Sequence, residues 1–415
     1  MITLKAFKAL RPRADIVQKV AELPYDVMNS KEAKEIAKGN KYSFLHVDKS
    51  EIDLDENINL YDREVYIKAN ENLQSMIDSK VLIQDEKENL YIYRLIMNGK
   101  SQIGIVACTS IDDYINNKIK KHEHTRKDKE QDRINHVDFC DANTGPIFLT
   151  YKYNDKIDNV ISSWIQKEPV YDFTAEDGVK NTVWVVDDGE TINNICDLFK
   201  DVDSLYIADG HHRAASAVKV GLRRREENPN YSGSEEFNFF LSVIFPHSHL
   251  NIIDYNRIVK DLNGLSNEEY MNKVLEKFNI DICEGQGPYK PSSKHNYGMY
   301  LNGKWYILTA KEGTYDPLDP VERLDVSILQ NNLLDPILGI KDPRTDNRID
   351  FVGGIRGLKE LEHRIDEKST GVAFSMYPTT LEDLMNIADA GEVMPPKSTW
   401  FEPKLRSGLF IHKLK

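Results

Sequence analysis

Two Asn-Gly dipeptides, each between apolar runs, constrain the fold of this chain more than any other feature of its sequence. Asn98 and Gly99 separate the runs 91–97 and 101–110, and a second Asn-Gly, beginning at Asn302, lies within NYGMYLNGKWYILTA. Asn-Gly is the strongest short hairpin signal, because both central residues of the tight turn take positive φ angles. The sequence therefore predicts two antiparallel hairpins.

Helical periodicity alternates with these strands. Ser266 is a predicted N-cap with Glu269 three residues further on, and TTLEDLMNIADAG ends at Gly391, a typical C-cap. Helices are also predicted in RLDVSILQNNLL and GIRGLKELEHRI, and a buried strand in FNFFLSVIFP. The mixture predicts a mixed α/β or α+β fold. At about 150 residues per domain, 415 residues suffice for two or three domains.

We place a boundary near Lys260, before the polar stretch NGLSNEEY. Residues 1–260 would then form a catalytic core that carries the reactive segments described below. Residues 261–415 would form an additional α/β part that completes the site.

Composition excludes several classes of protein. The formal charge of −13 disfavours a general nucleic-acid-binding surface. No run approaches the roughly 18 apolar residues of a membrane span, and the first 17 residues lack the apolar core of a secretory signal. The four cysteines stand singly, which predicts neither a disulfide framework nor a zinc knuckle. We expect a cytoplasmic protein that binds neither nucleic acid nor membrane.

The first segment that can carry chemistry is KIKKHEHTRKDKEQDRINHVDFCDANTGP, residues 118–146. Between residues 118 and 133 it holds seven basic residues against four acidic ones, a local balance of +3 inside an acidic protein. A positive pocket on a negative molecule suits a small polyanionic substrate. His122, Glu123 and His124 add groups that can transfer protons or bind a metal, although HEHTR lacks the H-E-x-x-H spacing of a zinc protease.

The alternative for this segment is a solvated helix with i,i+4 pairs such as Arg126–Glu130. The adjoining turn at residues 143–146, which contains Thr144, favours the pocket. A charged helix that enters a tight turn resembles a pocket wall.

The second segment, LYIADGHHR followed by AASAVKVGLRRR, predicts a strand, a turn at Asp209-Gly210 and a helix from Ala214 onward. Such a junction presents unpaired backbone N–H groups and the positive end of the helix dipole, which together form an anion site. Two histidines and Arg213 at this end would clamp phosphoryl oxygens, and Asp209 could hold a divalent metal or act as a base. The alternative is that His211 caps the turn and Arg213 forms an ordinary surface ion pair.

Two segments near the C-terminus have weaker signals. DFVGGIRG, with Gly353-Gly354 before a predicted helix, forms either a backbone anion cradle or a simple tight turn. In MPPKSTWFEPKLRSG, three consecutive side chains could bind phosphate, on a loop that prolines stiffen: Lys397, Ser398 and Thr399.

Near the N-terminus, two polar residues stand among apolar ones. Asp26 could be a site carboxylate, but an Asx turn or the N-cap of the SKEAKEIAKG helix is the preferred interpretation. His46, in SFLHV, is interpreted as a core histidine within a strand. Neither G-x-x-x-x-G-K-[ST] nor G-x-G-x-x-G occurs, which leaves room for a small inorganic phosphate donor.

The chain resembles the family filed as domain of unknown function 1015 (DUF1015). The resemblance is carried by PYDV, SFLHV, KIKKHEHTRKDKEQDRINH, NTGPIF, ADGHHRAASA and MPPKSTWFEPKLRSG, and it runs over essentially the whole chain. The DGHHR junction is also similar to one in ParB-like proteins, a group that includes nucleotide-dependent free-serine kinases and chromosome-partitioning CTPases. The chain lacks the helix-turn-helix and the basic DNA-binding face of the partitioning proteins.

The resemblance implies a ParB/serine-kinase-like core with an additional α/β C-terminal part. It also implies a pyrophosphate-dependent kinase that makes O-phospho-L-serine from L-serine. By position, the implied phosphate-binding turn consists of Asp209, Gly210, His211, His212 and Arg213. The HEHTR block would complete the pocket through His122, Glu123 and Arg126.

We therefore expect a diphosphate–serine phosphotransferase that uses Mg²⁺ to bridge the donor oxygens. Glu123 is the preferred base and Asp209 the metal anchor, while further cations would offset the donor's charge: Lys121, Arg126 and Lys129. The expected contacts to the amino acid and its surroundings are Asp26, Thr144, Arg344, Arg356, Lys397, Ser398 and Thr399. The alternatives are an ADP- or ATP-dependent serine kinase, a phosphoserine or pyrophosphate phosphatase, and a ParB-like nucleotide-binding switch.

Overall fold

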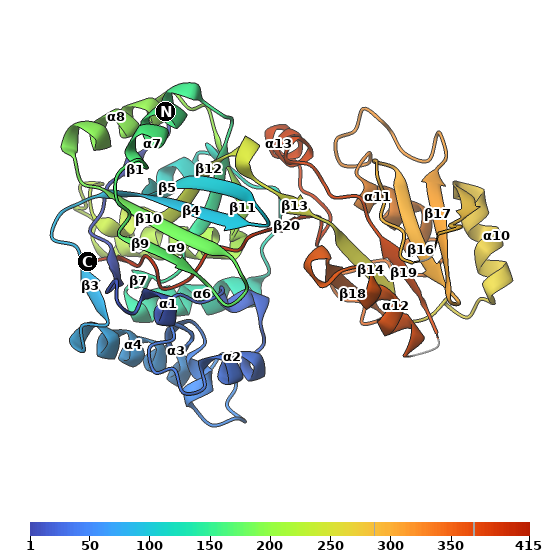
Figure 1. The fold of residues 1–415 in the computed structure, drawn as a ribbon, viewed down its shortest axis with the longest axis horizontal. Helices are drawn as coiled ribbons and strands as arrows, with labels where there is room; N and C mark the ends of the chain where they lie inside the picture. The colour runs from blue at the N-terminus through green and yellow to red at the C-terminus, as the bar shows by residue number, and fades with distance from the viewer. Residues whose placement is uncertain (286, 368–369) are drawn as a thin grey trace. The chain divides into compact units, whose positions relative to one another are not determined.

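The computed structural model describes residues 1–285, 287–367 and 370–415 (Figure 1). The chain divides into two compact units, residues 1–250 with 403–415, and residues 251–402. The predicted division at residue 260 differs from this one in two ways. The chain leaves the first unit ten residues earlier, and its last thirteen residues return to that unit.

Unit 1 is built on a nine-stranded mixed sheet with the strand order β6-β11-β8-β12-β5-β4-β10-β9, to which β1 is added beside β5. The pairs β11/β6 and β12/β8 are parallel and the others antiparallel. In this order the strands span Ile119–Lys120, Leu205–Asp209, Ile147–Tyr151, Phe239–Pro246, Lys100–Ser110, Leu90–Met97, Lys180–Val186 and Tyr171–Thr174, with β1 at Leu4–Lys5.

Two short ribbons complete the strands of unit 1. They pair β2 (Leu10–Pro12) with β3 (Leu82–Gln84), and β7 (Ala142–Asn143) with β21 (His412–Lys413). The second ribbon explains why the C-terminus returns, because it buries the apolar segment 409–411 in this unit.

The helices of unit 1 surround this sheet, with α2–α4 at one end and α7 and α8 at the other (Figure 1). The α-helices α1 to α9 span Val17–Val20, Ser30–Ala37, Leu45–Asp48, Arg63–Asp78, Ile111–Ile115, Lys127–Cys140, Asp155–Trp164, Gly189–Lys200 and His211–Glu227. Short 3-10 helices lie at Tyr25–Val27, Ser50–Asp53, Glu236–Asn238 and His247–His249.

Unit 2 contains a six-stranded antiparallel sheet with the order β15-β17-β16-β19-β14-β18, and a separate ribbon of β13 and β20. Its strands β13 to β20 span Ile252–Ile253, Tyr255–Val259, Phe278–Ile282, Asn296–Leu301, Lys304–Ala310, Ile349–Gly353, Val372–Ser375 and Trp400–Phe401. Its α-helices α10 to α13 span Asn267–Lys277, Asp325–Leu329, Lys359–Asp366 and Leu381–Ala390, with a π-helix at Gln330–Leu334 and a 3-10 helix at Gly354–Arg356.

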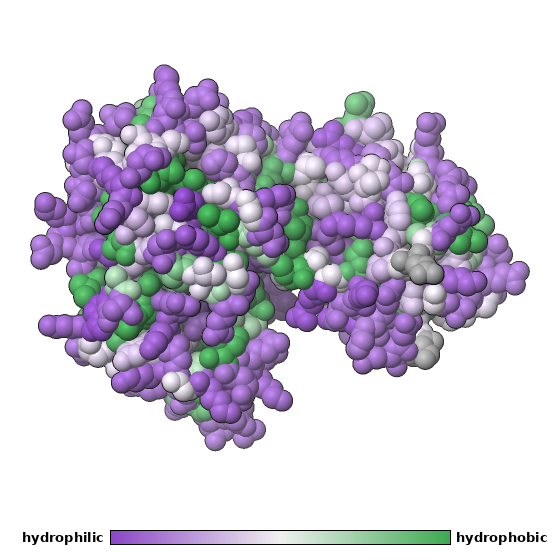
Figure 2. Space-filling view, in the orientation of Figure 1, coloured by the Kyte–Doolittle hydropathy of each residue, from purple (hydrophilic) through white to green (hydrophobic). Residues whose placement is uncertain are grey.

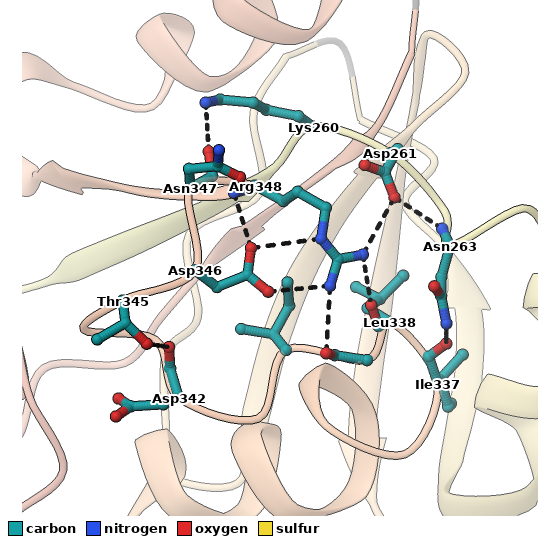
Figure 3. A network of polar contacts seen from close by, with 12 residues as sticks. Lys260, Asp261, Asn263, Ile337, Leu338, Asp342, Thr345, Asp346, Asn347 and Arg348 are labelled. Atoms are coloured by element: carbon teal, nitrogen blue, oxygen red, sulfur yellow. Dashed lines mark hydrogen bonds and ion pairs between the residues drawn. The ribbon is translucent and has the colours of Figure 1, made fainter.

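The polar network around Arg348 shows why residue 260 is not a domain boundary (Figure 3). The Lys260 backbone N–H donates to the Arg348 carbonyl at 2.9 Å, so it continues the pairing of β14 with β18. The Arg348 guanidinium in turn contacts Asp346 at 2.9 Å and Asp261 at 3.4 Å, and donates to the Leu338 carbonyl at 3.0 Å. Lys260 and its neighbours are therefore tied into unit 2 on both sides.

Local signals in the sequence are confirmed where they depend on a few adjacent residues. Asn98 and Gly99 take φ angles of 51° and 77° between β4 and β5, and the Asn-Gly between β16 and β17 does the same. Ser266 forms a capping box with Glu269, and α13 ends at Gly391 in the left-handed conformation.

Three local predictions are wrong. The segment SFLHV contains the short helix α3 rather than a strand. His46 is partly exposed on this helix, and its Nδ1 lies 2.9 Å from Asp53 Oδ2. Asn29, not Asp26, caps α2, because Asn29 stands three residues before the Glu32 that completes the capping box. Helix α9 begins at His211, three residues earlier than predicted. Gly210 takes the left-handed conformation, so the chain turns directly from the strand into the helix.

Close packing of α9 depends on a glycine in its middle. A Cβ atom on Gly221 would lie 2.5 Å from the Phe237 carbonyl oxygen and 2.8 Å from Ile111 Cδ1. Replacing glycine by alanine in a helix interior stabilises the helix by about 1 kcal/mol, but the overlap of the new Cβ atom with the Phe237 backbone costs about 1–3 kcal/mol. Gly221→Ala should therefore lower the free energy of unfolding, measured with urea. Gly189→Ala in α8, where nothing lies within 4 Å, is the control and should not lower it.

The surface in Figure 2 is mainly hydrophilic, with apolar residues in scattered patches. Among the described residues, no helix combines the length and apolar character needed to cross a membrane.

Candidate functional site

The candidate site is built on the junction between β11 and α9. The strand ends at Asp209, Gly210 takes φ 95°, and α9 begins at His211. Glycine is required here for two reasons. Its φ is left-handed, and a Cβ atom would lie 3.1 Å from Arg213 Nε. The arginine side chain thus folds back over the turn, beside the free N–H groups at the start of a 17-residue helix.

The two strongest predicted segments meet at this junction. Strand β6, just before the HEHTR block, pairs in parallel with β11. The backbone N–H of His122 donates to His211 Nε2 at 3.4 Å, and the backbone N–H of Arg126 donates to His212 Nε2 at 3.0 Å. Residues about 90 positions apart in the sequence therefore lie side by side, in the two segments that the family resemblance implied would share a pocket.

Asp209 is an ionised, already paired carboxylate. Its Oδ2 lies 3.2 Å from Lys404 Nζ and 3.8 Å from an Arg213 nitrogen, and its Oδ1 accepts the Gly210 N–H at 2.9 Å. Burial alone would raise the pKa of Asp209, but the charges of Lys404 and Arg213 outweigh it and hold that pKa well below its usual value. Asp209 is thus suited to fixing the two cations rather than to accepting a proton.

Glu123, His122 and His211 form a second cluster beside the turn. Glu123 Oε2 lies 3.9 Å from His211 Nδ1, and the rings of His122 and His211 meet edge to face with centroids 4.4 Å apart. Burial, with the positive surroundings, lowers the pKa of His211 well below its usual value, so the ring is neutral. The side chain of Glu123 is 42% exposed, so it faces solvent.

The same three residues are the group that could hold a metal ion, since one ligand atom from each lies within 4.8 Å of the others. His122 Nδ1 is buried without a hydrogen-bond partner in the described part of the chain, which fits a ligand atom. Two imidazoles and one carboxylate suit a transition metal better than Mg²⁺, which prefers oxygen. For Mg²⁺ the cluster offers one suitable group, Glu123, and substrate phosphates would have to supply further oxygens.

His122 makes the stability of unit 1 depend on pH. Burial lowers its pKa from 6.5 to about 4, so below pH 6.5 the unfolded chain binds a proton that the folded chain does not. The contribution of neutral His122 to the free energy of unfolding is complete above pH 6.5 and is lost as the pH falls towards 4. Between pH 7 and pH 5 it decreases by about 2 kcal/mol.

We expect His122→Gln to remove that part of the pH dependence in urea unfolding followed at pH 7 and pH 5. The exposed His363, replaced in the same way, is the control and should leave the dependence intact. An unchanged dependence in His122→Gln would contradict the assignment.

Arg213 also lines a cavity of about 30 Å³. It is lined by Tyr25, Asp48, Arg133, His136, Val137, Asn143, Thr144, Gly145, Ile147, Arg213 and Ser407. Burial lowers the pKa of the Arg213 guanidinium, but the charges of Asp26 and Asp209 outweigh this and raise it, so the group is charged. The permanently positive guanidinium of Arg213 therefore lines the cavity and also lies over the turn at Gly210.

The remaining predicted residues of unit 1 lie around these features. Thr144 lines the cavity and donates a hydrogen bond to Asp48 at 2.8 Å. Lys121 Nζ lies 4.4 Å from the ring centre of Tyr114, and Lys129 Nζ donates to the Tyr61 hydroxyl at 3.0 Å. Arg126 pairs with Asp128 rather than with Glu130. Asp26 is exposed in the 3-10 helix Tyr25–Val27.

The other predicted contacts belong to unit 2 and have local roles there. Arg344 pairs with Asp342 at 2.8 Å, and Arg356 ends a 3-10 helix. The Ser398 hydroxyl donates to the Pro395 carbonyl at 2.6 Å. In the same loop Lys397 has φ 59°, and Thr399 follows these two residues.

Gly353 and Gly354 allow close packing instead of an anion cradle. Added Cβ atoms would lie 3.1 Å from the Trp400 ring and 2.6 Å from Asp254 Oδ1.

Sequence reasoning missed four site residues. Lys404, which pairs with Asp209, lies in the quoted block MPPKSTWFEPKLRSG, but nothing there connects it to a turn 195 residues earlier. Arg133 belongs to the basic run of residues 118–133 but had no predicted role. Tyr25 lies within the block PYDV, and Asp48 directly follows the block SFLHV. Their one common signal is that they lie within or beside those blocks.

Comparisons with known proteins give one family and several distant structures. The family model described as Protein of unknown function (DUF1015) matches residues 4–327. No curated protein matches the chain.

Three solved structures are similar to this chain at low scores. A variant of free serine kinase in complex with ADP has a TM-score of 0.37 and 15% identity, with 74% of this chain and 92% of that chain covered. A conserved hypothetical protein from Pyrococcus furiosus has a TM-score of 0.35 and 16% identity, with 74% and 94% covered. SbnI from Staphylococcus aureus, truncated at its C-terminus, has a TM-score of 0.37 and 11% identity, with 74% and 86% covered.

Proposed function

This chain belongs to the DUF1015 family, and from that premise we propose that it transfers a phosphoryl group from pyrophosphate to the hydroxyl of free L-serine. The observation that carries the proposal is the meeting of HEHTR and DGHHR at the start of α9. There a helix N-terminus, two buried histidines, an arginine and a lysine surround one turn, beside a half-exposed carboxylate. This is a site for a polyanion next to a base.

The donor would bind at the turn. Phosphoryl transfer asks a protein mainly for positioning and for neutralisation of charge on the phosphoryl oxygens. The N–H groups at the start of α9 and the guanidinium of Arg213 supply fixed donors, and Lys404 adds a second cation at Asp209. Arg126 and Lys129, whose segment has a positive balance, would offset the remaining charge.

The reaction is an in-line displacement. The serine hydroxyl oxygen forms a bond to one phosphorus atom of pyrophosphate, and the bond from that phosphorus to the bridging oxygen breaks. Phosphate leaves with the bonding electrons, and the hydroxyl proton passes to a carboxylate. The products are O-phospho-L-serine and phosphate.

Glu123 is the base in this proposal. It is 42% exposed and close to neutral His211, whereas the oxygens of Asp209 are held by Lys404, Arg213 and the Gly210 N–H. A carboxylate whose pKa is kept low by two cations is a weak base. Asp209 therefore keeps an anchoring role for the cations.

Mg²⁺ would enter as part of the donor. It supplies positive charge to the phosphate oxygens, and Glu123 is the residue of the cluster that can add an oxygen ligand. Asp209, already paired with two cations, is a poorer anchor for Mg²⁺ than the sequence suggested.

Phosphorus NMR tests the proposal directly. Purified protein is incubated with L-serine, Mg²⁺ and, in separate tubes, pyrophosphate, ADP or ATP. We expect a phosphoserine signal with pyrophosphate. Phosphoserine only in the nucleotide tubes would overturn the donor and keep the kinase. Orthophosphate without phosphoserine would indicate a hydrolase, and absence of turnover in every tube would overturn the proposed activity.

A further inference from the structure

The cavity beside Arg213 contains a buried carboxylate that forms no direct ion pair with a residue of the described chain. Asp48 is 5% exposed and lines this cavity, and the hydroxyl of Thr144 donates to its Oδ1 at 2.8 Å. In the described ranges of the chain Asp48 forms no ion pair within 4.0 Å, and its charge interacts with those of Arg133 and Arg213 only at longer range. Burial of an unpaired charge is costly, so a cavity that keeps one is prepared for a positive ligand group.

Two arginines line the same cavity. Arg213 donates to the Pro146 carbonyl, and its Nε, which lies beside Gly210, is buried without a hydrogen-bond partner among the residues that the structure describes. Arg133 binds Asp132 through Nε and one terminal nitrogen, at 3.0 and 2.8 Å, and lies 4.1 Å above the Tyr25 ring. Guanidinium groups held in this way present planar donors that match a carboxylate.

The cavity thus combines one unpaired negative group with two positive groups in a small space. At about 30 Å³, the enclosed part of the cavity has room for small polar groups only. A ligand that satisfies both charges at once must carry a cation and an anion a few bonds apart. Free α-amino acids with small side chains have this structure.

We propose that this cavity binds the α-ammonium and α-carboxylate groups of the acceptor amino acid, with Asp48 holding the ammonium and Arg133 and Arg213 holding the carboxylate. The inference rests on the proposed function, because the acceptor there is free L-serine. Thr144 is a positioning residue that orients Asp48. Arg213 would then face both substrates, the amino acid on the cavity side and the donor on the side of the turn.

The assignment changes which residues define the acceptor. Asp26, Arg344 and Arg356 were the sequence-based candidates for the amino acid's two charges. Asp26 is exposed, and Arg344 already pairs with Asp342. Asp48 is buried and unpaired, which makes it the stronger partner for an ammonium group.

Asp48→Asn tests this assignment, because asparagine keeps the acceptor for Thr144 and removes the charge. We expect the KM for L-serine to rise about 100-fold, as for loss of one member of a buried charge pair, with the KM for pyrophosphate unchanged. The control is Asp138→Asn on the same helix as Arg133. Asp138 pairs with Arg223 and Arg224 outside the cavity, and its loss should leave both KM values unchanged.

Acceptor analogues separate recognition from a merely structural role. 3-Hydroxypropanoate is serine without the ammonium group, and wild-type protein should prefer L-serine to it by at least about 100-fold in kcat/KM. Asp48→Asn should lose most of this preference, since the group that reads the ammonium is gone. A variant that retained the wild-type preference would overturn the proposal.

Calorimetry of L-serine without any donor distinguishes this inference from the proposed function. If wild-type protein binds L-serine and Asp48→Asn does not, the cavity assignment stands even if no tube yields phosphoserine. If phosphoserine forms but Asp48→Asn leaves the KM for L-serine unchanged, the inference fails and the kinase remains. Should Asp48→Asn not fold, as judged by circular dichroism, Thr144→Val replaces it. Thr144→Val should raise the same KM about tenfold, and an unchanged value would overturn the proposal.

Discussion

Arg213→Ala should lower the turnover of L-serine with pyrophosphate by about 100- to 1,000-fold, the usual effect of removing one fixed donor from a charged transition state. The guanidinium lies over Gly210, contacts Asp209 at 3.8 Å and lines the cavity, so its removal alters the turn and the cavity together. Asp209 keeps Lys404 as a partner, and we therefore expect an unchanged circular dichroism spectrum.

Arg224→Ala is the matched control. It removes another largely buried arginine of α9, one that pairs with Asp138 and Asp141 away from the turn. Some stability should be lost but turnover retained. Arg213→Lys should recover little activity, because an ammonium group cannot reproduce the planar donors of a guanidinium. Wild-type turnover in Arg213→Ala would remove the phosphate-binding role of the turn.

Glu123→Gln should lower kcat by about 100- to 10,000-fold, with little change in the KM for either substrate, if Glu123 accepts the serine proton. The amide keeps the size of the side chain and its contact with His211 but cannot take up a proton. Initial rates of phosphoserine formation at several concentrations of each substrate separate the two constants.

Asp209→Asn is the comparison that decides between the two carboxylates. Because Asp209 fixes Lys404 and Arg213, its loss should act mainly on the KM for pyrophosphate. The opposite pattern, with kcat lost in Asp209→Asn and only binding altered in Glu123→Gln, would assign the base to Asp209.

Several features of the site could be predicted because their signals are local. Asp209-Gly210 after an apolar run predicts a strand that ends in a turn, and the basic HEHTR segment predicts a positive wall. Local patterns failed where the same short apolar pattern is compatible with both a strand and a helix. The apolar residues around His46 in SFLHV suit a strand, but contacts of α3 with α4 and with the 3-10 helix Ser50–Asp53 stabilise a helix there.

The substrate contacts were the least predictable part. Three of the seven expected residues, at positions 397–399, were expected because ammonium and hydroxyl groups suit phosphate. In the structure the Ser398 hydroxyl donates to the Pro395 carbonyl of the same loop, and Lys397 Nζ lies 5.7 Å from the centre of the Tyr255 ring. Asp48 and Arg133 gave no such signal. Their importance comes from lining one cavity with Arg213, and no spacing in the sequence describes that arrangement.

Local patterns were thus enough to predict the hairpins at the two Asn-Gly turns, the caps of α10 and α13 and the mixed α/β fold, and to single out the two segments that meet at the candidate site. Each depends on the conformational preferences of a few adjacent residues. Three further facts follow from the folded chain alone: Lys404 returns to pair with Asp209, the chain divides at residues 250 and 402, and Asp48 is buried beside the arginines of the cavity. These facts depend on contacts between residues up to 195 positions apart. Such contacts are fixed by the packing of the whole unit, which leaves no periodic trace in the sequence.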